Sequence, residues 1–251
     1  MFEDLVPHIR EFRNRLVYSV LALIACFIAC FFFWEPIFEF ILKPLMKVIP
    51  AGSEVIFTHP AEAFFTAMKV SFFAGFLLAL PFMFWQFWLF VAPGLYENEK
   101  KYVLPFVGST TIMFLIGCAF CYYFVLPTAF GFLINFGSGE TMIAMPRIGE
   151  YVGFFIKLIL AFGISFELPI ITFFLALLGL VTDQDLKGFF RYAIVLIFIF
   201  AAVMTPPDIL SQFMLAVPLI ALYAGSILIA KFVNPEVELN IDAEDEPKED
   251  N

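Results

Sequence analysis

The sequence predicts an all-α integral membrane protein in which six kinked transmembrane helices form a concave wall. Hydrophobic residues make up 62% of the chain and charged residues only 15%, whereas soluble domains average roughly 45–50% and 25%. The mean hydropathy is +0.94. The apolar residues also gather in runs long enough to cross a bilayer, which takes about 20 helical residues.

The first three apolar runs predict spans at about 17–41, 64–91 and 102–126. The stretch from Val17 to Trp34 carries no charge and follows three arginines. It is longer than the apolar core of a signal peptide, and no small-residue cleavage site follows it, so we expect a retained span. Pro81 predicts a kink in the second span because proline removes a backbone donor.

The last three runs predict spans at about 151–180, 192–204 and 209–230. The first of them is longer than a bilayer requires, and Gly163 and Pro169 predict a kink in it. The second would reach only about 20 Å as a helix, and two prolines follow it directly. We therefore expect this short span to thin the bilayer locally.

Basic residues predict the orientation of these spans. The amino-terminal segment, the 92–101 and 181–191 loops and the tail contain nine Lys and Arg, while the remaining loops contain three. Because cytoplasmic loops carry the excess of positive charge, both termini are expected in the cytoplasm. The loops at about 42–63 and 127–150 would then form a cap on the outer face.

The formal charge of −9 arises mostly from one end of the chain, where eight acidic residues lie within the last sixteen. We therefore predict that residues 233–251 form a disordered acidic cytoplasmic tail, which follows a membrane domain of residues 1–232. This charge argues against nucleic acid as a partner. The motifs of nucleotide-binding and zinc enzymes are absent, so we expect no catalytic residue, metal or cofactor. The four cysteines lie in apolar runs and are expected to pack.

Glu167 lies in the middle of the fourth predicted span. An ionisable group there costs at least about 2.5 kcal/mol on insertion scales, so it should face protein or water. A functional role is one interpretation. The other is a neutral carboxyl group that hydrogen-bonds within the bundle and only holds helices together.

Two further groups of polar residues lie near predicted helix ends. Glu11 and Arg15 are spaced for an intrahelical pair, which would by itself explain both. In the loop after the second span, Glu99 could bind a cation or be neutralised by the lysines that follow it. Thr205, Asp208 and Gln212 form a polar patch between the last two spans, which would hydrogen-bond either to a partner helix or within the chain.

Four segments together resemble the TatC family, the multispanning subunit of the twin-arginine protein translocase. The matching segments are residues 8–16, 86–101, 161–169 and 205–212, which occur in the order of the family. The resemblance covers residues 5 to about 232. Two lysines stand at positions 100 and 101 where arginines are common in the family, and the acidic tail is particular to this chain.

The resemblance implies a receptor in the bacterial cytoplasmic (inner) membrane for the twin-arginine signal peptides of folded cargo proteins. It places signal binding on Glu11, Arg13, Phe90 and Glu99, and a polar role within the membrane on Glu167. It also implies contacts of Thr205, Asp208 and Gln212 with the single-span proteins TatA and TatB, assembly with other TatC copies, and export driven by the proton-motive force.

The carboxylates fit this role because guanidinium groups pair bidentately with them. The apolar part of the signal would need a second site, for which a Phe-lined, proline-kinked wall within the membrane is suited. A proton- or ion-coupled transporter of small solutes is the rival class, since Glu167 lies mid-span. The chain lacks the internal repeat of many such transporters. A scaffolding subunit without a binding site is a third interpretation.

Overall fold

The described residues of the computed structural model (2–50, 55–91, 103–137, 145–205 and 209–233) are helical apart from turns and one isolated bridge. By length and composition, six helical stretches among them suit a membrane crossing. The all-α membrane fold class is therefore confirmed. The structure divides into two compact units, residues 1–164 and 165–251, which are described separately. The concave shape of the wall stays a prediction.

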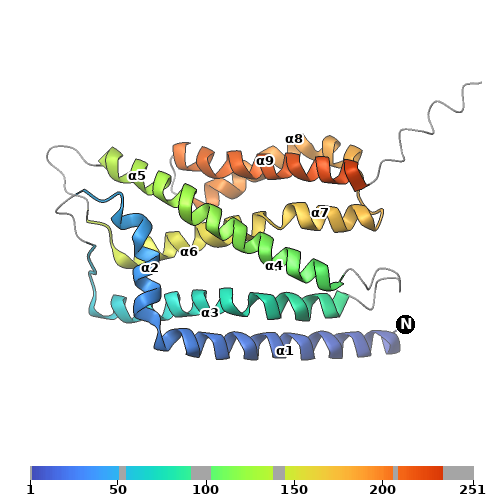
Figure 1. The fold of residues 1–251 in the computed structure, drawn as a ribbon, viewed down its shortest axis with the longest axis horizontal. Helices are drawn as coiled ribbons and strands as arrows, with labels where there is room; N and C mark the ends of the chain where they lie inside the picture. The colour runs from blue at the N-terminus through green and yellow to red at the C-terminus, as the bar shows by residue number, and fades with distance from the viewer. Residues whose placement is uncertain (1, 51–54, 92–102, 138–144, 206–208, 234–251) are drawn as a thin grey trace, which may run out of the picture. The chain divides into compact units, whose positions relative to one another are not determined.

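The first unit contains two long antiparallel helices, an interrupted third span and one shorter cross-helix (Figure 1). Its helices are α1 (Phe2–Phe32), α2 (Trp34–Met46), α3 (Pro60–Val91), α4 (Val103–Phe120), a π-helical turn (Cys121–Val125), α5 (Leu126–Gly137) and α6 (Ile148–Ser165). Helix α2 crosses the ends of α1 and α3 rather than continuing α1.

The break between α1 and α2 corrects the predicted span of 17–41. Helix α1 ends at Phe32, and Phe33 leaves the helical conformation with φ −116° and ψ 27°. Pro36 explains the break, since it lacks the N–H that would bond the carbonyl of Phe32 in a continuous helix. The residues after Phe33 form a separate helix with a buried face made by Ile41, Pro44 and Leu45.

Helices α1 and α3 approach closely at Gly75. A methyl group at this position would lie 2.7 Å from the Cα of Phe27, nearer than a real contact allows. Glycine therefore permits the two backbones to touch, as small residues do where membrane helices pack. Beyond this contact α3 continues without interruption past Pro81.

The third and fourth predicted spans both contain irregular turns. The π-helical turn of residues 121–125 lies between α4 and α5. In the fourth span α6 ends at Ser165 and the next helix begins at Leu168, with Pro169 in its first turn. Proline is favoured there because the first helical N–H groups have no partner within the helix. The interruption falls at Phe166 and Glu167.

The second unit contains α7 (Leu168–Leu177), α8 (Asp183–Met204) and α9 (Ile209–Val233). Both α7 and α8 pack on α9. The Tyr223 hydroxyl of α9 donates to the Leu186 carbonyl at 3.1 Å, and the rings of Phe198 and Phe213 lie 5.1 Å apart. These contacts join the last two helices along much of their length.

The fifth span is longer than predicted. Helix α8 has 22 residues because it begins at Asp183, where Thr182 and Asp185 form a capping box. The first turns of α8 are charged and polar, so an interpretation based on apolar runs alone placed the start of this span too late. The predicted 13-residue length of the span at 192–204 was wrong, and the argument from this length for a locally thinned bilayer no longer applies.

Candidate functional site

The start of α1 holds a carboxylate beside an arginine of the same helix. The Arg15 guanidinium donates through Nε to Glu11 Oε1 at 3.0 Å, and its second nitrogen contacts the same oxygen. The Glu11 side chain is 35% exposed and that of Arg15 is 22% exposed. Surface pairs with this spacing contribute little stability. Glu11 can therefore exchange Arg15 for another cation at small cost.

Next to this pair, the end of α3 meets the start of α1. The rings of Phe12 and Phe90 lie 5.2 Å apart. A hollow of about 260 Å³ extends from this contact along both helices, lined by Phe12, Arg15, Leu16, Ser19, Val20, Leu23, Met83, Gln86, Phe87 and Phe90. Almost all of these side chains are apolar, so a half-exposed carboxylate lies at the edge of an apolar recess.

The structure thus brings three of the four predicted signal-binding residues to one end of the first unit. Glu11 and Arg13 lie on α1, with Arg13 exposed, and Phe90 lies one residue before the end of α3. Glu99 lies outside the described residues.

Glu167 lies at the interruption between α6 and α7, as the residue that precedes α7. It is 7% exposed, and its Oε1 has no hydrogen-bond partner among the described residues. A buried carboxylate oxygen without a partner costs free energy. A carboxyl group whose only role is to join helices would hydrogen-bond to a neighbouring helix. Glu167 Oε1 makes no such bond to a described residue, so this interpretation is not supported for this atom.

The predicted polar patch of the second unit is partly satisfied within the chain. The Thr205 hydroxyl donates to the Ala201 carbonyl at 2.9 Å, and the Gln212 amide donates to the Phe198 carbonyl at 3.0 Å. Intramolecular bonding, one of the two interpretations of this patch, therefore accounts for these donors. Asp208 lies outside the described residues.

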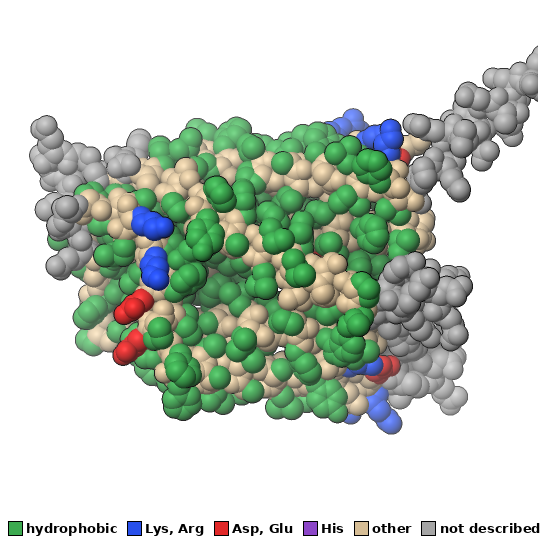
Figure 2. All heavy atoms as spheres, viewed as in Figure 1, with side chains coloured by type: hydrophobic (Ala, Val, Ile, Leu, Met, Phe, Trp, Pro, Cys, Tyr) green, Lys and Arg blue, Asp and Glu red, His purple; other side chains and the backbone are tan. Residues whose placement is uncertain are grey.

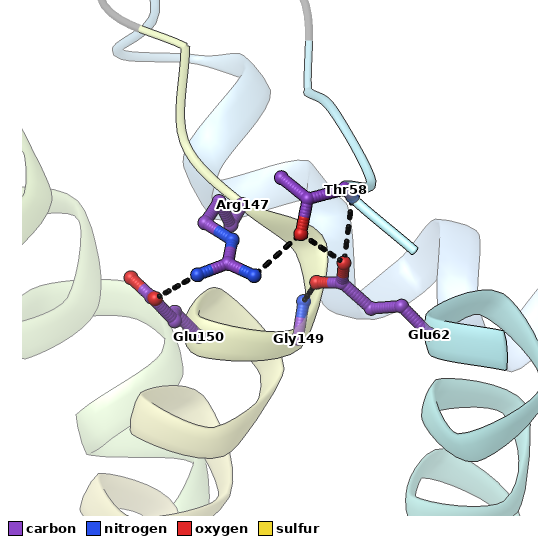
Figure 3. A network of polar contacts seen from close by, with 5 residues as sticks. All are labelled: Thr58, Glu62, Arg147, Gly149 and Glu150. Carbon is purple, nitrogen blue, oxygen red and sulfur yellow. Dashed lines mark hydrogen bonds and ion pairs between the residues drawn. The ribbon is translucent and has the colours of Figure 1, made fainter. Parts of the chain in front are cut away.

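A third cluster, which the sequence reasoning missed, joins the start of α3 and the residue Thr58 before it to Arg147 and the start of α6 (Figure 3). The Glu62 carboxylate accepts from the Thr58 backbone N–H at 2.8 Å and from the Gly149 N–H at 3.0 Å. Arg147 donates to the Thr58 hydroxyl and to Glu150. A bridge between Ile56 and Arg147 runs beside it.

The position of Glu62 in this cluster could have been predicted from the sequence. Glu62 falls in the first turn of α3, where an acidic side chain suits the free N–H groups of a helix start. Its bond to Gly149 spans 87 positions, which no local pattern indicates. An added methyl group at Gly149 would lie 2.9 Å from Glu62 Oε1, so a larger residue there would displace this carboxylate oxygen.

These features define a class: a multi-pass helical membrane protein whose described residues hold no group of side chains suited to a metal. A family model described as Sec-independent protein translocase protein (TatC) matches residues 7–218. The chain belongs to this family. It is a component of a protein translocase and not an enzyme, and the resemblance drawn from its four motifs is confirmed.

Relatives and solved structures agree with this assignment. A TatC protein of Campylobacter jejuni is 52% identical over 94% of this chain and 96% of its own length. One of Helicobacter pylori is 50% identical over 94% and 90%. A crystal structure of a twin-arginine translocase receptor TatC has a TM-score of 0.81 at 36% identity and covers 90% of this chain and 99% of that chain.

Proposed function

We propose that this chain is the core receptor subunit of a twin-arginine translocase, and that it binds the signal peptides of folded proteins at the cytoplasmic face. The observation that carries the proposal is the half-exposed Glu11 at the edge of the apolar recess between α1 and α3. Guanidinium groups of a signal peptide pair with Glu11 and Glu99, while apolar side chains enter the recess. The excess of basic residues supports a cytoplasmic location for this end of the helices and for both termini.

The Glu11–Arg15 pair indicates the order of the steps by which the signal peptide binds. A signal arginine replaces Arg15 on the Glu11 carboxylate, and Arg13 stays exposed beside it. The apolar segment of the signal then follows the recess from Phe90 toward Leu23 and so passes from the interface into the membrane.

We further propose that TatA, TatB and other TatC copies are the partners, in a bacterial cytoplasmic membrane. Helix α8 presents a stripe of exposed apolar residues that includes Val195, Ile199 and Val203. A single-span helix can pack on this stripe and end near Thr205, Asp208 and Gln212. Gln212 keeps one amide N–H and its carbonyl oxygen for such a neighbour after its bond to Phe198.

Glu167 has its role after binding. Its buried position and its Oε1 without a described partner suit a group that gains a partner when a signal or a neighbouring helix arrives. We expect Glu167→Gln to bind signal peptide normally and to lower proton-motive-force-driven export about tenfold or more. Peptide binding and vesicle export are measured on the same preparation. Weak binding by this variant would place Glu167 in the recognition step instead.

Site-specific photocrosslinking tests the receptor proposal. Phe87 and Phe64 form a matched pair, since both lie on α3 with side chains 57% exposed, one near each end. A photoreactive residue at position 87 or 99 should crosslink a signal peptide with two arginines and not one with two lysines. Position 64 should crosslink neither. Equal crosslinks with both peptides, or none at 87 and 99, would overturn the proposal.

The rival transporter interpretation loses support from the comparisons, because the relatives are named protein translocases. The scaffold interpretation differs from the proposal in one measurable respect. If the chain were only a scaffold, Glu11→Ala and Glu99→Ala would leave export intact.

A further inference from the structure

A large apolar groove opens on the first unit, separate from the recess beside Glu11. Its volume is about 710 Å³, within the range of sites for small ligands. Its walls include Phe40, Phe73, Pro81, Cys118, Tyr122 and Phe155. From Phe73 to Pro81 it follows α3 for about 12 Å, so it extends from the α2 side into the apolar part of the bundle.

Helix α2 carries a ridge of four exposed charged residues at one rim of this groove. Glu35, Glu39, Lys43 and Lys47 follow at intervals of four. Each such step rotates about 40° beyond a full helical turn. The ridge therefore drifts around α2, and the two lysines end on the flank of Phe40, which lines the groove. Figure 2 shows positive side chains over the region of α2, with apolar surface beside them.

Lys43 contacts the wall of the groove through the ring of Phe40. The Lys43 ammonium lies 5.8 Å from the centroid of the Phe40 ring. That ring stacks on Tyr122 at 4.5 Å with an interplanar angle of 3°, and the Tyr122 hydroxyl donates to the Phe40 carbonyl at 2.8 Å. Tyr122 belongs to the π-helical turn, a type of irregularity frequent at functional sites.

We propose that this groove binds one anionic glycerophospholipid, whose phosphate contacts Lys43 and Lys47 and one of whose acyl chains lies between α2, α3 and α4. Helix α2 lies across the ends of the spans, so its lysines stand at the level of lipid head groups. Basic side chains beside an intramembrane pocket are the pattern of head-group recognition. The apolar wall below them matches a hydrocarbon chain.

The chemistry of the wall favours a lipid over a peptide segment. A peptide in the membrane has to satisfy each N–H and C=O group, and the lining residues of the groove are almost all apolar. The Tyr122 hydroxyl already donates to Phe40. A hydrocarbon chain needs no such partner. A free phosphate would use the lysines but leave the apolar groove empty.

Native mass spectrometry of the full-length protein in detergent, titrated with phosphatidylglycerol, tests the proposal. Lys43→Gln with Lys47→Gln should weaken binding about 25-fold, at about fivefold for each lysine. Lys69→Gln with Lys157→Gln is the matched control, because these lysines are also exposed but lie on α3 and α6 and not on the ridge of α2. The control should bind as the unchanged protein does.

Two further measurements distinguish the contribution of the lipid head group from that of its acyl chain. Ala74→Leu with Ala119→Leu fills the groove wall and should weaken binding at least fivefold while both lysines remain. The head group without acyl chains, glycerophosphoglycerol, should not compete. Equal binding by the lysine pair and its control, equal affinity for zwitterionic phosphatidylethanolamine, or competition by the free head group would overturn the proposal. No signal peptide is used, so the result is independent of the receptor proposal.

Discussion

Two glutamates near opposite ends of α3, Glu11 and Glu62, differ in how the fold holds them. Glu11, packed beside the carboxyl end of α3, pairs with an arginine one turn along its own helix. Glu62, in the first turn of α3, accepts from Thr58, which precedes α3, and from Gly149 in the first turn of α6. The first carboxylate is exchangeable, whereas the second forms part of a tertiary contact.

This difference gives criteria that distinguish a carboxylate that binds a ligand from one that stabilises the fold. A binding group keeps solvent access and a weak local partner, so that a ligand can replace that partner. A structural group receives several donors, at least one of them from a segment distant in the sequence, and removing it leaves those donors without an acceptor. Exposure alone does not separate the two cases.

The largest effect is expected from charge reversal at the receptor end. Glu99→Lys removes an acceptor for a guanidinium group and adds repulsion, so we expect twin-arginine peptide binding to weaken by about 100-fold or more. Fluorescence binding with peptides that carry two arginines measures it. Glu35→Lys, which reverses an exposed charge on α2, is the control and should bind normally. Normal binding by Glu99→Lys would remove this loop from the site.

Glu62→Ala is expected to have a smaller effect, and this effect is on stability rather than on peptide binding. This variant leaves the Thr58 and Gly149 donors without their acceptor, and we expect the melting temperature in detergent to fall by about 5 °C. Peptide affinity should stay within about twofold.

The control for Glu62 is Glu150→Ala, which removes an exposed pair with Arg147 at 3.0 Å. Its melting temperature should change by less than about 1 °C. Equal changes in both variants would mean that the donors from distant segments add nothing beyond a surface ion pair.

The smallest effect is expected from Arg15→Gln. Without its intrahelical partner Glu11 is free to receive a signal arginine, and a pair with this spacing corresponds to about a twofold change in affinity. We therefore expect twofold tighter binding, measured by peptide titration. Arg10→Gln removes the same charge from an exposed position and serves as the control. Weaker binding by Arg15→Gln alone would show that Arg15 itself contacts the signal.

Much of the fold and part of the site were predictable from local patterns. The apolar runs predicted six spans, and the family resemblance predicted a signal-binding role for Glu11, Arg13 and Phe90, which lie at one end of the first unit. The α1–α2 break and the true start of α8 were missed, although Pro36 and the Thr182–Asp185 box signal them. These errors arose because apolar content was weighed more heavily than the chemistry of helix ends.

The sequence by itself determined that the chain is helical and crosses a membrane, since length and hydropathy of a run are local properties and each span must satisfy its own backbone hydrogen bonds. Only the tertiary structure decided that Phe90 meets Phe12, that Glu62 bonds Gly149 and that Lys43 stands over the Phe40–Tyr122 stack. Each of these contacts joins residues whose proximity depends on how helices pack, and packing depends on shape at single positions such as Gly75.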